Sequence, residues 1–456
     1  MHDLSETIVA VATPPGRGGV ACVRLSGPAA VDVAGVLFRP AQGAIDAEAS
    51  RAVFGRFVGR DGSSIDHGYA VVFAAGASFT GELTAELWTH GSPAILAELL
   101  IAATTAGAVL AGPGEFTYRA LRNGRLDLAR AEAVRDLVAA RTLFQARVAF
   151  AQAEGALSRR LAPLREALAD LMARTEAAVE FVDESETHLP GRALAEGIER
   201  ALTACTELLE GFRQGRVVRE GATVVITGRP NVGKSSLFNQ LLARDRAIVT
   251  EIPGTTRDTL EEQIDLDGIP VKLVDTAGLR HVVDPVEGEG VRRARAAREE
   301  ADVVVVVLDG TSPPNDEERT ILAEIAGAPD PARGLVVVNK IDLTEAGDAP
   351  LRATGAVRVS ARTGEGLDDL RQAMRERLLG AGALEDPILT DVRHARAIDR
   401  AREALERGAA AAAKGVSEEL VLEDLREAMH NLGSVTGEMG PDELYDRIFS
   451  TFCIGK

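Results

Sequence analysis

Cysteine is scarce in this sequence and widely scattered. Among 456 residues only Cys22, Cys205 and Cys453 occur, and no two of them form a C-x-x-C pair. An odd number of distant cysteines argues against a disulfide framework and against the common zinc motifs. We therefore expect a protein of a reducing cytoplasm. Cys453 nevertheless stands close to the C-terminus, where a disordered tail would have no packing need for it.

Long hydrophobic runs are also lacking. The strongest run, VVVVVL at residues 303–308, has the length of a strand and is too short to span a bilayer. The N-terminal segment MHDLSETIVAVATPPGRGG has no basic n-region and soon meets two prolines, so we expect no signal peptide. A prenylation box fits the C-terminal CIGK poorly, because Gly455 is not aliphatic and lysine is an unusual last residue.

Basic residues are outnumbered by acidic ones. The chain has 51 Lys and Arg against 69 Asp and Glu, which gives a formal net charge of -18. Because phosphates are neutralised by Lys and Arg, such a chain is a poor non-specific binder of nucleic acid. A nucleic-acid substrate would require a local basic patch or a basic partner protein. The length predicts two to four domains.

A phosphate-binding loop is the clearest motif that is present. The segment ATVVITGRPNVGKSS, residues 222–236, reads as a β-branched strand, the pattern G-x-x-x-x-G-K-S and the start of a helix. Its glycines let backbone N–H groups surround phosphates, while Lys234 reaches the outer phosphates and the Ser235 hydroxyl ligates Mg²⁺. The strand and helix on either side argue against a chance glycine turn. The predicted contacts are Asn231, Val232, Gly233, Lys234, Ser235 and Ser236.

Two later segments indicate which base is bound. LVVVNKIDL places Asn339, Lys340 and Asp342 at the end of an apolar strand. An Asp carboxylate there can accept hydrogen bonds from N1–H and the exocyclic amine of guanine, a pair that adenine does not offer. The predicted nucleotide is therefore GTP. The segment Ser360, Ala361 and Arg362 follows the next strand and is typical of the loop that backs the base.

Two switch loops are expected between these motifs, ordered by GTP and released after hydrolysis. KLVDTAGLR provides Asp275, which should hold Mg²⁺ through water, and Gly278, whose N–H should sense the γ-phosphate. The upstream segment IVTEIPGTTRDT provides Thr256 as a second Mg²⁺ ligand. The remaining predicted GTP contacts in the two loops are Thr250, Glu251, Ile252, Pro253, Gly254, Thr255, Thr276 and Ala277.

A water-orienting glutamine is missing after D-x-x-G. Many small GTPases have glutamine at this position, whereas this sequence has Leu279. Glu287 could position the water instead, or the side-chain oxygen of Asn231 could ligate a potassium ion that supplies positive charge. From the residues alone, Glu287 is better explained as a solvated surface acid. Asn231 is explained equally well as a turn residue after Pro230.

The pattern of predicted helices, strands and turns changes along the chain and indicates a multidomain protein with α/β and α+β parts. Residues 1–120 show short strands and glycine-rich turns, an α+β pattern suited to binding or dimerisation. Residues 121–214 and 381–456 are helical and should form one discontinuous domain. Residues 215–380 alternate strand and helix, as in a Ras-like doubly wound GTPase domain inserted between them, with one hairpin turning at residues 267–268.

These motifs together resemble a known family. TIVAVATPPGRGGVACVRLSG at the start, GRPNVGKSS, IPGTTRDT and DTAGLR in the middle, then SARTGEG and the terminal FCIGK, are similar in order and span to the MnmE family of tRNA-modification GTPases, also called TrmE. The terminal C-[ILV]-G-K is the most specific of these features. The resemblance runs from end to end.

The resemblance implies a role for the first domain. In this family that domain has a fold like tetrahydrofolate-dependent aminomethyl transferases, dimerises and binds 5-formyltetrahydrofolate or a related folate. By motif match the folate contacts are Arg24, Glu86 and Arg125, with Lys456 from the tail. The family commonly has lysine where Arg125 stands. The positive charge is kept, but the compact ammonium group is replaced by a planar guanidinium with several N–H donors. Without the resemblance, Arg24 and Arg125 would be read as surface ion pairs.

The resemblance also implies a reaction and a partner. Together with the FAD-containing protein MnmG, or GidA, the family adds an aminomethyl or carboxymethylaminomethyl group to C5 of the wobble uridine, position 34, of certain tRNAs. The homodimer and its partner form a heterotetramer or larger complex. GTP hydrolysis is activated by K⁺ and by dimerisation of the GTPase domains, with Glu287 as the water-positioning acid. The implied potassium ligands are Asn231, Thr250, Ile252 through its backbone, and Thr255.

Two other classes of protein share some of these features. A ribosome-assembly GTPase of the Era or Der type has similar nucleotide motifs, but it would be expected to carry a basic RNA-binding module or a second GTPase domain. A non-enzymatic membrane or signalling switch would be expected to carry a lipid anchor or a basic amphipathic segment. Neither set of features is evident in this sequence.

The tail has a spacing that explains its cysteine. Leu444, Ile448 and Phe449 recur at helical intervals and can bury against the helical domain, and Gly455 then permits a sharp turn. Lys456 would bring an ammonium group near Cys453 and favour its thiolate. A small apolar residue ending a helix is the plainer explanation. The resemblance favours instead a catalytic Cys453 presented at the tRNA-modification site, on the folate side.

Overall fold

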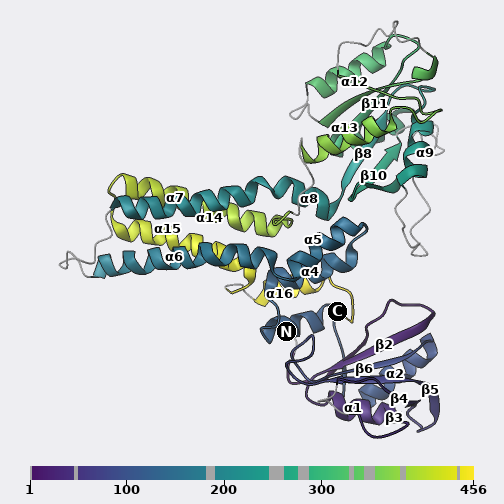
Figure 1. Cartoon of the computed structure of the whole chain (residues 1–456), viewed down its shortest axis with the longest axis vertical. Helices are drawn as coiled ribbons and strands as arrows, with labels where there is room; N and C mark the ends of the chain where they lie inside the picture. Colours follow the sequence, from purple (N-terminus) through teal and green to yellow (C-terminus); the bar gives the residue numbers. More distant parts are fainter. Residues whose placement is uncertain are drawn as a thin grey trace. The chain divides into compact units, whose positions relative to one another are not determined.

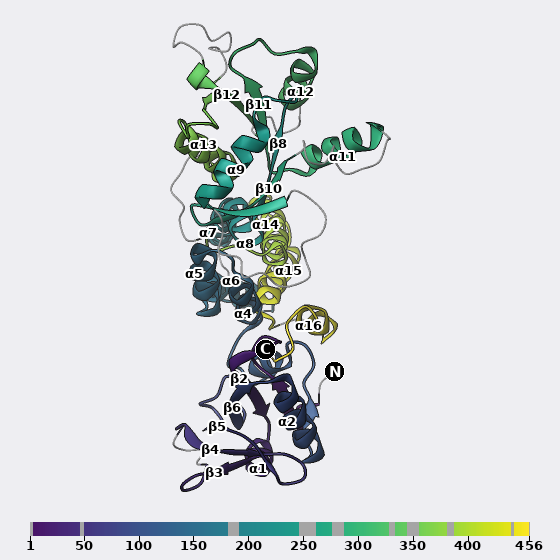
Figure 2. The same ribbon diagram turned by 90° about the vertical axis from the view of Figure 1, so that its right-hand side faces the viewer.

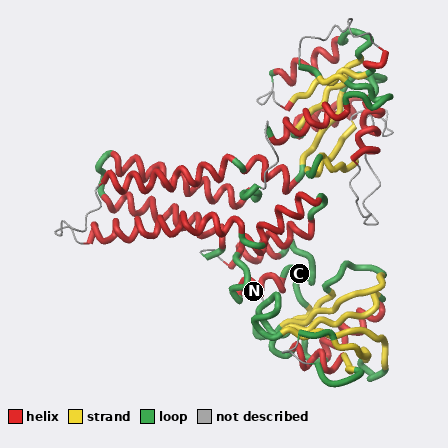
Figure 3. The backbone as a smooth tube through the Cα atoms, viewed as in Figure 1, coloured by secondary structure: helices red, strands yellow, loops and turns green. Residues whose placement is uncertain are grey.

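The computed structural model describes residues 3–45, 50–180, 191–245, 261–275, 287–327, 333–343, 355–380, 387–438 and 442–455. Two compact units contain them. The first joins Met1–Arg135 to Leu432–Lys456, and the second comprises Asp136–Asn431. Both units contain strands, and long helices belong to the second unit (Figure 3).

The first unit is built on a seven-stranded sheet of order β3-β4-β5-β6-β2-β1-β7 (Figure 1). All neighbouring strands are antiparallel except β1 and β7. Helices α1 (Ala30–Leu37) and α2 (Pro93–Thr105) cover one face, where alternate residues such as Val23 and Leu25 are buried. The strands are β1 (Ile8–Val11), β2 (Gly18–Ser26), β3 (Phe38–Pro40), β4 (Val53–Val58), β5 (Ser64–Phe73), β6 (Thr84–Gly91) and β7 (Val109–Leu110).

The C-terminal segment belongs to this first unit. Helix α16 (Asp442–Phe449) packs on α3 (Glu115–Arg122), and a small apolar core joins Phe449 and Ile448 to Tyr118 and to Leu128, the first residue of α4 (Leu128–Ala139). The helix predicted from the spacing of Leu444, Ile448 and Phe449 is confirmed. Its partners come from residues near 120, more than 300 positions away in the sequence.

Helices of the second unit come from both sides of the GTPase motifs. Helix α14 packs along α7, although the strands and helices of residues 222–379 lie between them in the sequence (Figure 1). Within residues 121–214, which were predicted to be helical, the stretch from Ala156 to Glu180 is a single helix that accommodates Pro163. The helices are α5 (Leu143–Ala153), α6 (Ala156–Glu180), α7 (Gly191–Glu210), α8 (Phe212–Glu220), α14 (Val392–Ala413) and α15 (Glu418–Thr436).

A six-stranded sheet of order β13-β12-β11-β8-β10-β9 carries the nucleotide motifs. Its strands are parallel except for β9, which forms the predicted hairpin with β10; positive φ angles of 51° at Asp267 and 97° at Gly268 make the tight turn. The strands are β8 (Ala222–Thr227), β9 (Glu261–Leu266), β10 (Ile269–Asp275), β11 (Val303–Asp309), β12 (Gly334–Asn339) and β13 (Val357–Arg358).

Helices cover both faces of this sheet (Figure 2). Alternate strand residues face different cores: Val224 and Val305 join one, while Val225 and Val304 join the other with Ile321 of α12. This is the doubly wound α/β arrangement, in which ligands bind at the carboxyl ends of the strands. The helices are α9 (Lys234–Asp245), α11 (Glu287–Glu300), α12 (Asp316–Ala326) and α13 (Leu367–Leu379). Among the helices described, none is both long and apolar enough to cross a membrane.

Candidate functional site

The phosphate loop connects β8 to α9 in a tightly constrained path. Gly228 and Gly233 have φ angles of 144° and 98°, which side chains other than hydrogen rarely allow. A Cβ at Gly228 would lie 2.3 Å from the carbonyl oxygen of Val307, so the loop passes directly against β11. Lys234 is buried and its Nζ donates to the Arg229 carbonyl oxygen at 2.8 Å, across the loop that would hold the phosphates.

A hydroxyl and a carboxylate meet beside this loop. Ser235 Oγ donates to Oδ2 of Asp275 at 2.8 Å, and Asp275 is the buried last residue of β10. Hard oxygen ligands of this kind suit Mg²⁺, which usually keeps several waters and takes few protein ligands. Among the residues described, no cluster of three or more His, Cys, Asp or Glu side chains is found. Ser235 and Asp275 therefore fit the predicted ion.

Asn339 joins the phosphate loop to the loop after β13. Its Nδ2 donates to the Val232 carbonyl oxygen at 2.8 Å, and its Oδ1 accepts from the Ala361 backbone N–H at 2.9 Å. The side chain is buried, so both bonds are shielded from water. A Cβ at Gly233 would lie 2.2 Å from Asn339 Nδ2, which explains why the phosphate loop needs glycine there.

Two neighbouring side chains fix the orientation of the Asp342 carboxylate. Ser360 Oγ donates to its Oδ1 at 2.6 Å, and Arg362 Nε donates to its Oδ2 at 2.9 Å. The hydrogen bond from Ser360 lowers the pKa of Asp342 below its ordinary value; desolvation opposes the shift and Arg362 adds to it. The carboxylate is therefore ionised at neutral pH, and it retains lone pairs for the two guanine donors.

Several predicted residues lie outside the described part of the chain. They include the whole segment from Thr250 to Thr256, residues 276–278, and Lys456. Glu287 is the first residue of α11, but its side chain is also outside the described set. For Asn231 the loop is described: its φ of 66° is left-handed, and the residue is exposed.

In the first unit, Arg24 and Glu86 lie together on the sheet face not covered by α1 and α2. They are direct partners in the β2–β6 register, and Arg24 Nε donates to Glu86 Oε1 at 3.0 Å. The guanidinium also lies over the buried Phe116 ring, 5.7 Å from its centroid. Arg125 belongs to the same unit, where its Cγ would be 3.1 Å from a Cβ at Gly81.

The C-terminal tail reaches this sheet. The Gly114 N–H donates to the Cys453 carbonyl oxygen at 3.3 Å, and Ile454 forms an isolated β-bridge with Pro113. Gly455 has a φ of 93°, as its predicted sharp turn requires, and a Cβ there would lie 2.3 Å from the Val11 carbonyl oxygen. Val11 follows Ala10, the register partner of Arg24. The tail therefore ends one strand away from the Arg24–Glu86 pair.

The three cysteines differ sharply in environment. Cys22 and Cys205 are buried, and burial raises the pKa of each thiol to about 12. Cys453 is exposed. Because the thiolate is the reactive form of cysteine, Cys453 is the only one of the three whose surroundings permit solution chemistry.

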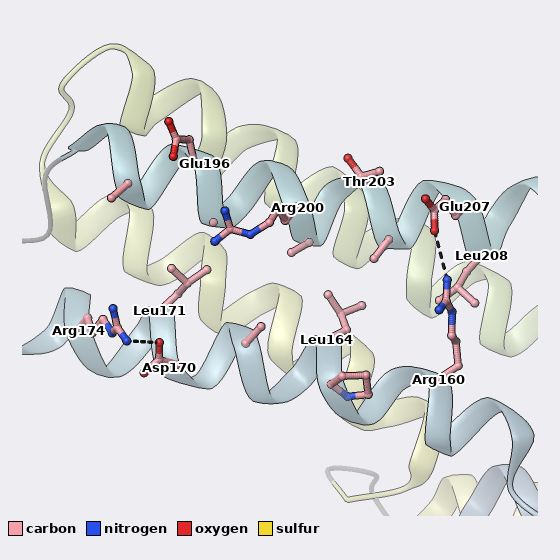
Figure 4. A pocket seen from close by; sticks show the side chains of 16 residues that line it. Arg160, Leu164, Asp170, Leu171, Arg174, Glu196, Arg200, Thr203, Glu207 and Leu208 are labelled. Atoms are coloured by element: carbon pink, nitrogen blue, oxygen red, sulfur yellow. Dashed lines mark hydrogen bonds and ion pairs between the residues drawn. The ribbon is translucent and has the colours of Figure 1, made fainter.

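A groove of about 1060 Å³ lies between α6 and α7. Figure 4 shows its apolar floor, with Leu164 and Leu171, and charged side chains along its rim. Two ion pairs cross or follow the rim, Arg160 with Glu207 at 3.2 Å and Arg174 with Asp170 at 2.8 Å. None of the residues that line it belongs to the nucleotide motifs.

Four residues of these sites were not predicted. Phe116 beside Arg24 carried no sequence signal. Arg229, Asp309 and Glu318 form a charged group behind the phosphate loop, with Arg229 Nε 3.3 Å from Glu318 Oε1. A signal did exist for Asp309, because it ends a buried β-branched strand, as Asp275 does.

Comparison with known proteins identifies the family. The family described as GTP-binding protein TrmE N-terminus matches residues 7–125, and MnmE helical domain matches residues 128–453. The tRNA modification GTPase MnmE of Koribacter versatilis is 44% identical over 456 residues, covering 100% of both chains. That of Aquifex aeolicus is 41% identical, covering 99% of this chain and 100% of the other.

The chain belongs to the MnmE family of tRNA-modification GTPases. As an MnmE-family member it is a GTP hydrolase acting in tRNA modification. Solved structures resemble only part of it: the G domain of T. maritima FeoB covers 34% of this chain and 98% of its own length at 27% identity, and Aquifex aeolicus Era covers 40% and 66% at 27% identity. Both have a TM-score of 0.26.

Asp342→Asn should change the nucleotide preference of this MnmE-family chain. The amide replaces one acceptor by a donor, so GTP affinity should fall roughly ten-fold or more, the usual effect of losing charge-assisted hydrogen bonds. Xanthosine triphosphate, which has a carbonyl where guanine has an amine, should bind better than to the wild type. Equilibrium binding measures both. Asp368→Asn, an exposed acid on α13 paired with Arg244, is the control; unchanged GTP affinity in Asp342→Asn would refute the assignment.

Proposed function

We propose that this chain hydrolyses GTP and, with an FAD-containing partner of the MnmG type, adds an aminomethyl or carboxymethylaminomethyl group to C5 of uridine 34 in certain tRNAs. The observation that carries the proposal is the docked tail: one chain combines a guanine-nucleotide site with an exposed Cys453 whose segment ends one strand away from the Arg24–Glu86 pair. An Era-type GTPase would have no use for this second site.

Each part of the chain has a place in this proposal. Residues 1–120 bind a folate and dimerise, residues 121–214 and 381–456 supply the helical domain and the CIGK tail, and residues 215–380 bind GTP. Mg²⁺ is held through Ser235 and Asp275, together with Thr256, and supplies charge neutralisation at the β- and γ-phosphates. The acidic chain itself is a poor match for tRNA, so a more basic partner supplies most of the phosphate contacts in the cytoplasm.

Potassium fits the one proposed ligand that the structure describes. Asn231 is exposed in a left-handed conformation at the phosphate loop, and no side-chain partner for it is found among the described residues. Its amide oxygen is therefore available to a monovalent cation, which would supply positive charge beside the phosphates. The proposal assigns the other ligands to Thr250, Ile252 and Thr255. Glu287, at the start of α11, then takes the place of the missing glutamine.

GTP hydrolysis should be at least about ten-fold faster in K⁺ than in Na⁺ of equal ionic strength, because the fit of the cation matters as well as its charge. Glu287→Ala should lower kcat roughly 100-fold while the affinity for GTP stays near normal, the signature of a residue that acts in the transition state. Phosphate release measures the rates.

The matched control is Glu299→Ala, which removes an exposed acid from the same helix. Equal rates in the two salts contradict the potassium site. If Glu287→Ala hydrolyses GTP with the same kcat as Glu299→Ala, Glu287 is a solvated surface acid and does not position the water.

Dimerisation of the N-terminal domain is supported by a row of aromatic side chains. On the sheet face opposite α1 and α2, Phe54 pairs in register with Tyr69, and Tyr69 with Trp88. Their exposed fractions are 49%, 50% and 36%. Contiguous exposed aromatic surface of this kind is typical of a protein interface, and an isologous dimer would bury the row against its own copy.

Replacing Phe54 and Tyr69 together by lysine should convert the nucleotide-free dimer to a monomer, because four buried ammonium groups would face one another across the two-fold axis. Sedimentation velocity measures the change. Val36→Lys is the control, since Val36 is 51% exposed but lies on α1, on the covered side of the sheet. A double variant that sediments like Val36→Lys shows that the dimer uses another surface.

Folate binding is supported by the geometry around Arg24. Its guanidinium is fixed by Glu86 and by the Phe116 ring, and part of it remains accessible, with 21% of the side chain exposed. A pre-organised guanidinium suits a carboxylate or a polar heterocycle. Arg125 and Lys456 are the further contacts in this proposal. Cys453 acts at the same side of the unit, on the tRNA-modification reaction.

Cys453→Ser should leave GTP hydrolysis and dimerisation near normal and abolish modification of the wobble uridine. The reason is that the tail lies in the first unit, whereas the nucleotide loops lie in the second. Nucleoside analysis of tRNA from cells that carry only the variant measures the outcome. Cys205→Ser is the control, because Cys205 is buried in the helical part. A wild-type level of wobble-uridine modification in the Cys453→Ser variant would show that the cysteine serves only in packing.

A further inference from the structure

A single carboxylate lies behind both nucleotide-binding loops. Asp309 is the last residue of β11, its register partner on β12 is Asn339, and its side chain is 11% exposed. Parallel pairing puts the carboxyl ends of β8, β11 and β12 side by side. The loop after β8 is the phosphate loop, and the residues after β12 recognise the base. Asp309 therefore stands between the two halves of the site.

One oxygen of this carboxylate holds the base-recognition loop. Lys340 Nζ donates to Asp309 Oδ2 at 2.7 Å. Lys340 has a φ of 67°, a left-handed conformation that side chains other than Gly, Asn and Asp adopt only when neighbours impose it. The ion pair is one such neighbour. Lys340 lies two residues before Asp342, so its position affects where the guanine-binding carboxylate stands.

The same oxygen faces the phosphate loop. Nη2 of the Arg229 guanidinium lies 3.7 Å from Asp309 Oδ2, and the same nitrogen donates a hydrogen bond to Ser312 Oγ. The backbone carbonyl of Arg229 is the group that accepts from Lys234 Nζ. Nε of the same guanidinium lies 3.3 Å from Oε1 of Glu318, which is almost fully buried. Arg229 thus ties the start of the phosphate loop to the segment after β11.

The other oxygen fixes the orientation of the carboxylate. Oδ1 accepts from the Thr311 backbone N–H at 3.0 Å and from Thr311 Oγ1 at 2.6 Å. Burial alone would raise the pKa of Asp309, but the hydrogen bonds from Lys340 and Thr311 outweigh it and lower the pKa to about 2. The group is therefore charged at any pH at which the enzyme works, and it presents Oδ2 to two cations at once.

We propose that Asp309 is a positioning residue that couples the phosphate loop to the base-recognition loop, through Arg229 on one side and Lys340 on the other. This inference rests on the GTP site described above. Asn339 already joins the two loops through neutral hydrogen bonds to the backbone. Asp309 adds a link between charged side chains. Removing the charge of Arg229 or of Lys340 therefore changes the interaction of Asp309 with the other side chain.

Asp309→Asn in the full-length chain is the first test. The amide keeps the shape and can still accept from Thr311, but it no longer attracts the two cations. We expect Kd for GDP and KM for GTP to rise about five- to ten-fold while kcat stays within about two-fold, the pattern of a lost uniform binding interaction. Asp309→Glu should restore part of the affinity. Asp316→Asn, which removes a fully exposed acid from the start of α12, should change neither constant.

A double-mutant cycle separates coupling from simple stabilisation. Arg229→Gln and Lys340→Gln are made singly and together, and the Kd for GDP is measured. In the otherwise wild-type chain the combined loss should differ from the product of the single losses by at least about three-fold, as expected within one charge network. In the Asp309→Asn background the losses should multiply. Multiplicative losses in the wild-type background overturn the proposal, and this cycle alone decides it if Asp309→Asn fails to fold.

Thermal unfolding without nucleotide provides the remaining readout. If Asp309→Asn lowers Tm but leaves Kd for GDP and KM for GTP unchanged, the residue only stabilises the fold and the proposal is wrong. Failure of the wild-type chain to bind GDP or GTP would count against the nucleotide site itself, and so would be distinguished from failure of the coupling.

Discussion

Parallel pairing of β8, β10, β11 and β12 is the constraint on which the nucleotide site depends. It places the carboxyl ends of four buried strands at one edge, and each strand delivers a polar residue there: the phosphate loop after β8, then Asp275, Asp309 and Asn339. These groups are costly to bury alone. They are tolerated because hydrogen bonds to nearby groups offset the cost of removing each side chain from water. Asp275 accepts from Ser235, Asp309 accepts from Lys340, and Asn339 bonds to two backbone groups.

How far this could be read from the sequence depends on the range of the interaction. The hairpin at Asp267 and Gly268 and the helix carrying Leu444 and Phe449 follow from local chemistry and periodicity, and both are confirmed. The strand-end motifs could be assigned because their spacing reflects a fixed ligand. Asp309 could not be assigned a role, since its meaning comes from Arg229 and Lys340, which are 80 positions before it and 31 after it in the sequence. No local sequence pattern indicates that these three side chains are in contact.

The same reasoning applies to the first unit. Arg24 lies on the face of the sheet away from the helix-covered core, and no local pattern indicates that Glu86 is its register partner or that Phe116 lies under it. Family resemblance supplied the first two residues and Arg125 as one set. The structure joins Arg24 and Glu86 directly and sets Arg125 beside Gly81, so the relation of Arg125 to that pair remains a prediction.

The docking of α16 has a consequence for how the protein is made. The apolar core that joins Tyr118 and Leu128 to Phe449 also contacts Leu4, so residues from near both ends of the chain close it together. During synthesis the ribosome delivers Leu4 first and Phe449 only after the helical and GTPase parts have emerged. Apolar surface around Tyr118 therefore stays exposed to solvent throughout most of translation, and the first unit to be started is the last to be completed.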